Sequence, residues 1–349
     1  MTRPCLIDAL NGGTPARTPL SFGSWMTGDP YSDDPNYLFS DKWKCLYDRG
    51  LCFSHHCRVT RQIEHGVNTT IEEQKKDGGA YTISRKQTPI GTLQQIKRDS
   101  WAVEHWIKEP RDYKIMQWIV EHTEQTACYD EYEKELQRIG DYGLIVLLGS
   151  RSPAMSINVD WAGVETFCMD MAMEVPELYE LYEARKRFFI EETRLIAAGP
   201  GRFVKWPENL SGPMLGPQHY DELLASVYGE CIPIMEQGGK RVLVHYDGLL
   251  SAVSERIALA PIHILESLTE PPEGDMTYDD CRAAWPGKTF WGNINQHVFA
   301  LPEAELQQAI IDKRNRAGKT AFAFEMYECL PVNWEWALPI ILDTLRDLH

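Results

Sequence analysis

Two potential metal ligands follow a short apolar strand in the run Arg241-Val-Leu-Val-His245-Tyr-Asp247-Gly248. His245 and Asp247 stand two positions apart, so in extended backbone their side chains point to the same side. Gly248 lets the backbone turn immediately afterwards. Enzymes built on parallel strands hold their chemistry at strand tips of this kind. The structural alternative is that both side chains cap a turn and bond to local backbone.

Other polar side chains end further predicted strands in the same way. Glu266 and Glu325 directly follow apolar runs, where a helix-capping residue would more often be Ser, Thr, Asp or Asn. The remaining polar residues at strand ends are Glu208, Asn209, Asn293 and Glu328. Several carboxylates and a histidine at one edge repel one another unless a cation or hydrogen bonds compensate. The pattern therefore predicts a metal or acid–base site, with Glu208, Glu266 and Asn293 as candidate catalytic residues.

The elements that would position these residues alternate regularly from residue 142 onward. Strands are predicted at 144–148, 202–206, 241–245, 262–266, 289–293 and 320–325, with helical segments between them. Repeated strand–helix alternation implies parallel strands covered by helices. About eight such units fit the chain, which predicts an α/β fold of the (β/α)8 TIM-barrel type.

The first hundred residues are less regular. Strands are predicted at 20–26 and 51–59, a helix at 35–49, and a hairpin from the segments 80–84 and 91–96. Gly, Pro and Asp interrupt the rest of this region. We therefore expect one barrel domain over residues 1–349, in which residues 1–100 form an irregular N-terminal extension packed on the barrel.

Composition excludes several classes of partner. The chain of 349 residues is 43% hydrophobic and 25% charged, which is ordinary for a globular protein. Its net charge of −16 argues against nucleic acid or an anionic membrane as a partner. No stretch has the apolar length needed to span a bilayer, and the N-terminus lacks a signal-peptide core. These observations predict a cytoplasmic protein.

The nine cysteines do not predict a disulfide framework. Their number is odd and they are spread over a long chain, so most are expected to be free thiols in a reducing compartment. Cys45, Cys52 and Cys57 lie near His55 and His56, but their spacing matches no usual zinc pattern. The segment is better interpreted as a buried strand, from whose end either histidine could reach a pocket.

Four segments, taken in order, resemble the uroporphyrinogen decarboxylase superfamily over most of the chain. Leu10–Pro19 resembles the family's lead-in, in which an Arg-x-Pro precedes the first strand. Glu208–Pro217 is similar to an acidic strand end followed by a glycine- and proline-rich stretch and a helix. His245-Tyr-Asp-Gly takes the place of the family's His-x-Cys-Gly or His-x-Asp-Gly. Glu328-Cys329-Leu330-Pro331 resembles a Gly-Cys-x-Leu-Pro stretch of the zinc methyltransferase branch.

Two branches of this family must be separated. The decarboxylases carry an arginine-rich N-terminal signature for an acidic tetrapyrrole, whereas Phe22–Tyr31 contains no arginine here. The other branch transfers methyl groups to or from a corrinoid carried on a separate protein, and it uses zinc held by His, Cys and a C-terminal Cys. The resemblance therefore implies zinc at His245, Asp247 and Cys329. The alternatives for the third ligand are Glu266, Glu325 and Glu328.

The replacement of the family's cysteine by Asp247 bears on the chemistry. Carboxylate gives zinc less electron density than thiolate does, so the metal should be a harder Lewis acid that prefers oxygen. Zinc of this kind polarises the oxygen of a leaving alkoxide or phenoxide, which favours cleavage of a methyl ether or methanol. The candidates to line an aromatic-binding mouth are Trp25, Met26, Trp206, Trp291 and Tyr327. Each of these is equally consistent with a core position.

These observations lead to a ranked set of functions. The first is a zinc-dependent methyltransferase that moves a methyl group from an O-methylated small molecule to a cobalt(I) corrinoid protein. Its implied partners are that corrinoid-binding protein and the small-molecule methyl donor. The alternatives are a uroporphyrinogen-decarboxylase-like decarboxylase, the second half-reaction from methyl-corrinoid to a folate or thiol, and a non-catalytic barrel that serves as a binding subunit.

Overall fold

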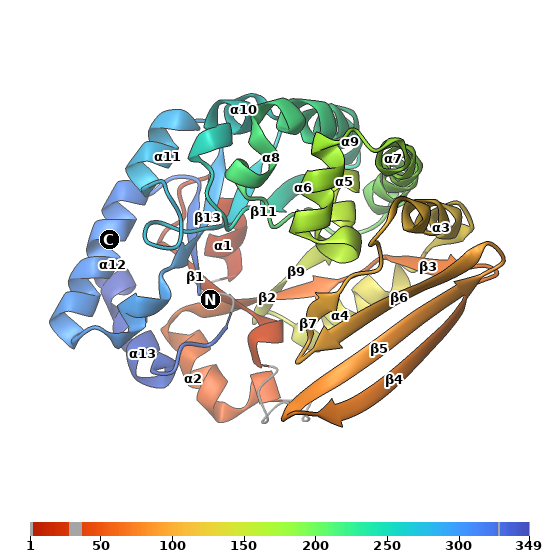
Figure 1. Cartoon of the computed structure of the whole chain (residues 1–349). Coiled ribbons are helices and arrows are strands. Elements are labelled where there is room, and N and C mark those ends of the chain that lie inside the picture. The colour runs from red at the N-terminus through yellow and green to blue at the C-terminus, as the bar shows by residue number, and fades with distance from the viewer. Residues whose placement is uncertain (1–2, 28–36, 327–328, 349) are drawn as a thin grey trace.

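Eight parallel strands close into a barrel, which confirms the predicted (β/α)8 TIM-barrel fold (Figure 1). The computed structural model describes residues 3–27, 37–326 and 329–348, so the predicted site residues Tyr327 and Glu328 lie outside the described ranges. The strands neighbour one another in the order β1-β14-β13-β12-β11-β10-β9-β2. Their bounds are β1 (Leu20–Gly23), β2 (Leu51–Cys57), β9 (Gly143–Leu148), β10 (Phe203–Trp206), β11 (Arg241–His245), β12 (Ile264–Leu268), β13 (Thr289–Ile294) and β14 (Phe322–Met326).

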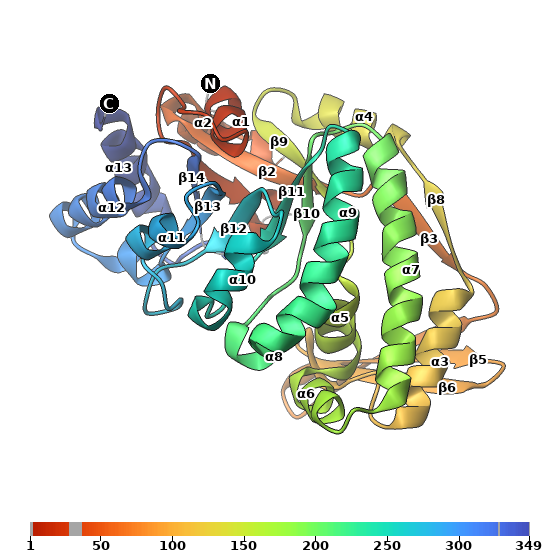
Figure 2. The ribbon, with the colours of Figure 1, turned by 90° about the horizontal axis from the view of Figure 1, so that it is seen from above.

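Helices surround the barrel, and α7 and α9 lie side by side along one flank (Figure 2). The α-helices are α1 (Arg3–Leu10), α2 (Asp41–Arg49), α3 (Pro110–Glu121), α4 (Asp130–Ile139), α5 (Pro153–Met155), α6 (Val164–Ala172), α7 (Pro176–Ala198), α8 (Gly212–His219), α9 (Ser226–Gln237), α10 (Ser254–Leu259), α11 (Tyr278–Ala284), α12 (Glu303–Ala317) and α13 (Trp334–Asp347). Two π-helices, η3 (Ser156–Ala162) and η4 (Tyr220–Ala225), adjoin α5 and α8. Short 3-10 turns are η1 (Ser24–Thr27), η2 (Tyr37–Phe39), η5 (Ser251–Val253) and η6 (Gln296–Ala300). No helix among the described residues is long and apolar enough to cross a membrane.

The amino end of the barrel is filled and closed by apolar side chains. Alternate residues of the strands, among them Leu243, Ile264 and Trp291, point inward and form one buried cluster. Leu6, Ala9 and Leu10 of α1 belong to the same cluster and are fully buried. Figure 1 shows α1 across the centre of the ring of strands. Because α1 closes this end, a site inside the barrel can open only at the carboxyl ends of the strands.

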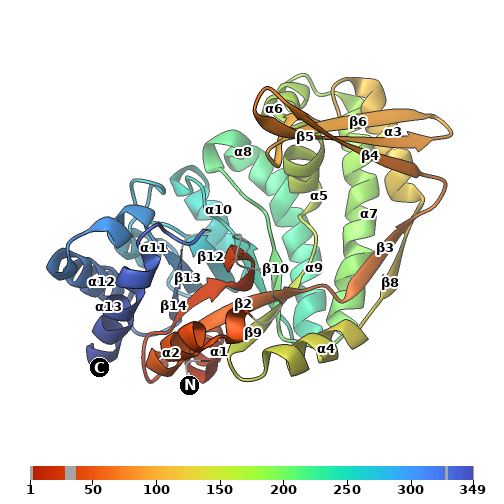
Figure 3. The same ribbon diagram turned by 90° about the horizontal axis from the view of Figure 1, so that it is seen from below.

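The first hundred residues contain the two predicted strands and the predicted hairpin, and more regular structure than the sequence indicated. They supply β1 and β2 of the barrel, and then β3 (Thr60–Glu64), which pairs with β8 (Thr123–Ala127). A four-stranded antiparallel sheet follows, made of β4 (Asn68–Lys76), β5 (Gly79–Thr88), β6 (Gly91–Arg98) and β7 (Trp101–Glu104). The sequence appears irregular because this sheet is largely solvated, with all nine residues of β4 exposed. In Figure 3, β3 and β8 run together from the barrel toward this sheet.

This region nevertheless shares its core with the barrel. Leu93 of β6 and Ile107 belong to the same buried cluster as Phe22 of β1 and Leu345 of α13. The four-stranded sheet is therefore held beside the barrel by apolar contacts as well as by the β3–β8 pair.

Candidate active site at the carboxyl end of the barrel

A histidine, a glutamate and a lysine from three neighbouring strands meet inside the carboxyl end of the barrel. His245 on β11 and Glu266 on β12 are direct register partners. One carboxylate oxygen of Glu266 lies 2.7 Å from Nδ1 of His245, and the other accepts a hydrogen bond of 2.6 Å from Nζ of Lys205 on β10. Burial acts to raise the pKa of Glu266, but the charges and hydrogen bonds of Lys205 and His245 hold that pKa well below its ordinary value. Glu266 is therefore ionised and fixes the orientation of the imidazole.

Asp247 faces the other side of the same imidazole. Its Oδ2 lies 3.7 Å from Nε2 of His245, and about a third of its side chain is exposed. Burial raises the pKa of Asp247, but its interactions with His245 outweigh that effect and the pKa is lowered. Since Lys205 compensates the charge of Glu266, Asp247 contributes the further negative charge that faces His245. This arrangement is the one found around metal-binding histidines, in which a carboxylate holds the ring nitrogen that does not bind the metal.

A second buried carboxyl group lies beside Glu266. Glu325 on β14 is 2% exposed, and its Oε1 has no hydrogen-bond partner among the described residues. Burial and the nearby Glu266 carboxylate raise the pKa of Glu325 well above its ordinary value. The shift favours the protonated, neutral form of Glu325, which adds no third negative charge to the site.

Lys205, His245, Glu266 and Glu325 line a cavity of about 490 Å³ at the barrel mouth. Asp247 faces His245 but is not one of the residues that line this cavity. Trp25 and Met26 of η1 form part of the wall, as the sequence predicted for both. The ring of His56 from β2 stacks on Trp25 with centroids 3.9 Å apart. Burial, assisted by the positive charge of Lys205, lowers the pKa of His56 to about 3. His56 thus presents a neutral imidazole to the cavity.

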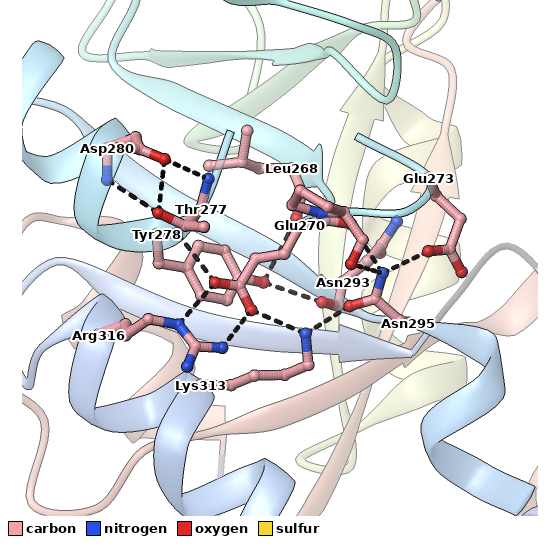
Figure 4. Close-up of polar contacts among 11 residues, drawn as sticks. Leu268, Glu270, Glu273, Thr277, Tyr278, Asp280, Asn293, Asn295, Lys313 and Arg316 are labelled. Atoms are coloured by element: carbon pink, nitrogen blue, oxygen red, sulfur yellow. Dashed lines mark hydrogen bonds and ion pairs between the residues drawn. The ribbon is translucent and has the colours of Figure 1, made fainter. Parts of the chain in front are cut away.

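Asn293 of β13 also lines the cavity, and a network behind it holds it in place (Figure 4). Its Nδ2 donates to the hydroxyls of Ser267 and Thr269 at 2.8 and 3.0 Å. The hydroxyl of Tyr278 donates to the Asn293 carbonyl at 2.8 Å. Tyr278 also belongs to a shell of residues around the carboxylate of Glu270, made of Tyr278, Lys313 and Arg316. Glu270 follows β12, the strand that carries Glu266. The position of Asn293 is therefore set by buried polar contacts.

Glu270 is the centre of that shell. Its carboxylate, 3% exposed, lies 2.8 Å from Nζ of Lys313 and 2.8 Å from Nη2 of Arg316, both on α12 (Figure 4). The backbone N–H of Tyr278 donates to the same carboxylate at 3.0 Å. Burial raises the pKa of Glu270, but these partners outweigh it and lower the pKa to about 2. The shell fastens the loop after β12 to α12.

Two predicted mouth residues lie elsewhere. Trp206 follows Lys205 on β10, and because neighbouring strand residues point to opposite faces, its ring packs outside the barrel between Phe189 and Tyr228. Trp291 does point inward, but it lies in the apolar layer below the mouth, where its Nε1 donates to the hydroxyl of Ser21 at 2.8 Å. The prediction that these two rings line the mouth is therefore corrected.

Glu208 lies behind the wall of the cavity. It is fully buried and accepts hydrogen bonds from the hydroxyl of Ser152 at 2.7 Å and from the hydroxyl of Tyr228 at 3.1 Å. Burial raises its pKa to about 7. Glu208 thus fastens the loop after β10 to the segment after β9 and does not line the mouth.

The described residues bring together two of the predicted metal ligands. Within residues 3–27, 37–326 and 329–348, no group of three His, Cys, Asp or Glu side chains is placed to hold a metal ion. Cys329 is exposed, and its Sγ accepts a hydrogen bond of 3.4 Å from Gln296. His245 and Asp247 fit one metal ion, because their facing atoms are 3.7 Å apart and each ligand bond to zinc is about 2.0–2.2 Å.

Several residues that line the mouth were not among the site residues predicted from the sequence. Lys205 could have been recognised, because in Arg202-Phe-Val-Lys-Trp it shares the inward face with Phe203. Arg58 and Arg151 also line the mouth, but they follow β2 and β9 in loops without a local pattern. The absence of arginine from residues 22–31 therefore does not mean that the mouth lacks arginine.

The comparisons with known proteins concern the fold. No family model matches the chain, and no curated protein matches it in sequence. A methyltransferase from Methanosarcina mazei is similar in structure, with a TM-score of 0.59 and 11% sequence identity over 99% of this chain and 98% of that chain. A pneumococcal exo-β-D-N-acetylglucosaminidase module has a TM-score of 0.43 and 7% identity over 98% of this chain and 85% of that chain. At these identities the likeness to the methyltransferase shows a shared barrel fold, and the second likeness carries no argument.

Proposed function

We propose that this protein is a zinc-dependent methyltransferase that moves a methyl group from an O-methylated small molecule, such as a methoxylated aromatic compound, to a cobalt(I) corrinoid on a separate protein. The observation that carries the proposal is the His245 imidazole, held through Nδ1 by Glu266 and facing Asp247 through Nε2. The whole-chain likeness in fold to a methyltransferase is consistent with it.

In this proposal His245 and Asp247 bind the metal, and the segment around residues 325–329 supplies a third ligand. Cys329 is the first candidate for that ligand, and Glu325 and Glu328 are the alternatives. A bound zinc ion would act as a Lewis acid toward the oxygen that leaves when the methyl group is transferred.

The protein's own residues have three roles. Glu266 orients His245, while Lys205 compensates the charge of Glu266. Trp25 and Met26 give the cavity an apolar wall on which a small organic donor can pack. Asn293, with its amide held by Ser267 and Thr269, presents a fixed polar group to the same cavity.

The decisive experiment measures metal content and methyl transfer together. We expect purified protein to hold about one zinc ion. His245→Ala should lose most of that metal and nearly all formation of methyl-corrinoid from reduced corrinoid protein and a methyl ether. His65→Ala is the matched control, because His65 is exposed and its imidazole lies 2.9 Å from Glu124 in the β3–β8 region, away from the barrel mouth.

The outcomes separate the alternatives. Full metal occupancy in His245→Ala contradicts the assigned ligands. Transfer only from methyl-corrinoid to a thiol or a folate reverses the direction of the proposed reaction but keeps the metal site. Decarboxylation of a porphyrinogen by metal-free protein would instead support the decarboxylase alternative.

A further inference from the structure

A second cavity, of about 560 Å³, adjoins the barrel mouth and is strongly basic. The two cavities share Arg58, Arg151 and Pro207 in their walls. The second cavity, called the basic chamber below, lies between the barrel and residues of β3, α3, η3 and α7. Its charged lining residues are Arg58, Arg61, Lys86, Arg151 and Arg185, against Glu64 and Asp160. The chamber therefore has more positive than negative side chains, whereas the whole chain has a net charge of −16.

Internal ion pairs account for only two of the five cations. Lys86 pairs with Glu64, and Arg151 donates to Asp160 at 2.7 Å and to Asn209 at 2.8 Å. Three cations of the chamber therefore have no carboxylate partner within 4.0 Å among the described residues, namely Arg58, Arg61 and Arg185. The hydrogen bond that Arg58 makes is a long one of 3.4 Å to the carbonyl of Leu148.

Arg185 is the most informative of the three, because it is 6% exposed. Its Nε donates to the hydroxyl of Ser156 at 3.2 Å, which is the one hydrogen bond of its side chain among the described residues, and Arg185 lines the chamber. The guanidinium lies 4.9 Å from the ring centre of Phe188 and 5.8 Å from that of Trp161. A guanidinium keeps its charge in proteins and presents paired donors that match a carboxylate or phosphate. Glu192 and Asp160 act electrostatically on this charge, but neither forms an ion pair with the guanidinium, so its donors remain available to an anion in the chamber.

A further unsatisfied donor lies at the same chamber. Nε of Arg151 is buried without a hydrogen-bond partner among the described residues. The π-helix η3 also carries the chamber residues Ser156, Asp160 and Trp161. Irregular π-turns are rare and occur frequently at functional sites, and buried polar atoms without partners are uncommon in proteins. Both features are typical of a binding site.

We propose that the basic chamber binds the carboxylate or phosphate group of a small molecule, with Arg185 as its buried donor and Arg58 at the border with the barrel mouth. The rings of Trp161 and Phe188, which lie near the guanidinium and line the chamber, favour a ligand with a planar, apolar part next to the anionic group. If the proposed methyltransferase function holds, this ligand is an anionic methyl donor, and that identification alone rests on the proposed function.

The test is titration calorimetry of the full-length protein with inorganic phosphate and, separately, with benzoate. We expect the wild-type protein to bind at least one of the two, and the preferred probe to identify the source of the anionic group. Arg185→Gln should weaken that binding roughly tenfold to hundredfold, since it removes charge-assisted hydrogen bonds. Arg187→Gln is the matched control, because Arg187 lies on the same helix but is exposed and paired with Glu121.

Arg58→Gln keeps the proposal testable if Arg185→Gln fails to fold, since Arg58 is exposed at the border of the two cavities. It should weaken the binding of the same probe. The proposal is overturned if neither probe binds the wild-type protein, or if Arg185→Gln and Arg58→Gln bind as tightly as Arg187→Gln does. Neither result depends on methyl transfer or on zinc content, so failure here is distinguishable from failure of the proposed function.

Discussion

The carboxylate of Glu266 lies 2.7 Å from Nδ1 of His245, and the two residues are direct register partners on adjacent strands. Because adjacent parallel strands lie about 5 Å apart, consecutive strand ends can bring such a pair into contact without any loop. The orientation of the imidazole is thus set by the most rigid part of the barrel. Lys205 lies on β10, the neighbour of β11 on the other side, and it donates a hydrogen bond to the same Glu266 carboxylate.

This contact predicts the effect of Glu266→Gln. The amide would still be close enough to bond to His245. However, it lacks the negative charge with which the carboxylate stabilises a protonated imidazole or polarises a neutral one. We expect zinc affinity or methyl-transfer activity to fall roughly 10–100-fold, as it does when carboxylates behind metal-binding histidines are changed. Competition with a metal chelator measures the affinity. Glu236→Gln is the control, because Glu236 makes a similar contact of 3.0 Å with His263 outside the mouth. Equal affinities in the two variants would contradict an orienting role for Glu266.

A second prediction concerns stability and pH at Glu208. Its pKa is about 7 in the folded protein because of burial, and its ordinary value is 4.5. The folded state therefore binds more protons than the unfolded state between these values, and stability falls as pH rises from about 4.5 through 7. The full difference is roughly 3 kcal/mol, at about 1.36 kcal/mol for each pKa unit. Urea unfolding of wild type and Glu208→Gln at pH 5 and pH 8 measures it. The difference between the two pH values should shrink in the variant, and an unchanged difference would contradict the assignment.

A third prediction concerns Glu270 behind the site. Glu270→Gln leaves the buried Lys313 and the neighbouring Arg316 without their carboxylate, and breaking a buried pair in this way costs about 3–5 kcal/mol. The free energy of unfolding from urea titration measures the loss. Glu303→Gln at the exposed start of the same helix should have little effect.

The same carboxylate has a pH dependence of opposite sign to that of Glu208. Its folded pKa is about 2, below the ordinary 4.5, so its contribution to stability is complete above about 4.5 and is lost as pH falls through 2. The difference in unfolding free energy between wild type and Glu270→Gln should therefore be constant above about pH 4.5. It should narrow as the pH falls from about 4.5 toward 2, because Glu270 then becomes protonated. A constant difference from pH 7 to pH 2 would contradict this assignment.

The sequence predicted the residues whose position depends on local pattern. His245, Asp247 and Glu266 follow apolar runs at strand ends, so their convergence followed from the barrel topology. Trp206 was misplaced although the alternation of Phe203 and Lys205 carries the information. The turn at Asp77-Gly78, where both residues have positive φ, is likewise a readable hairpin signal in a region predicted to be irregular.

The basic chamber could not be predicted in this way. Arg58 follows a barrel strand, Arg185 lies in the middle of a long helix, and Asp160 lies in a π-helix. Their approach depends on how α7 and the segment after β9 pack beside the β3–β8 pair. No periodicity within any one segment encodes that packing.

The last prediction concerns Asp247 and the choice of substrate. A carboxylate ligand should leave zinc harder than a thiolate would, so a metal at His245 and Asp247 favours a substrate in which negative charge develops on oxygen. Such a metal lowers the barrier only if that oxygen charge is present in the transition state. Asp247→Cys should therefore reduce methyl-corrinoid formation from a methyl ether and increase transfer from methyl-corrinoid to a thiol. Absorbance of the corrinoid follows both reactions, and zinc content measured in parallel shows that the metal is retained. Asp247→Asn, which removes the charge without adding sulfur, should slow ether cleavage without increasing thiol transfer. An unchanged ratio of the two activities in Asp247→Cys would show that the residue does not set the direction of the reaction.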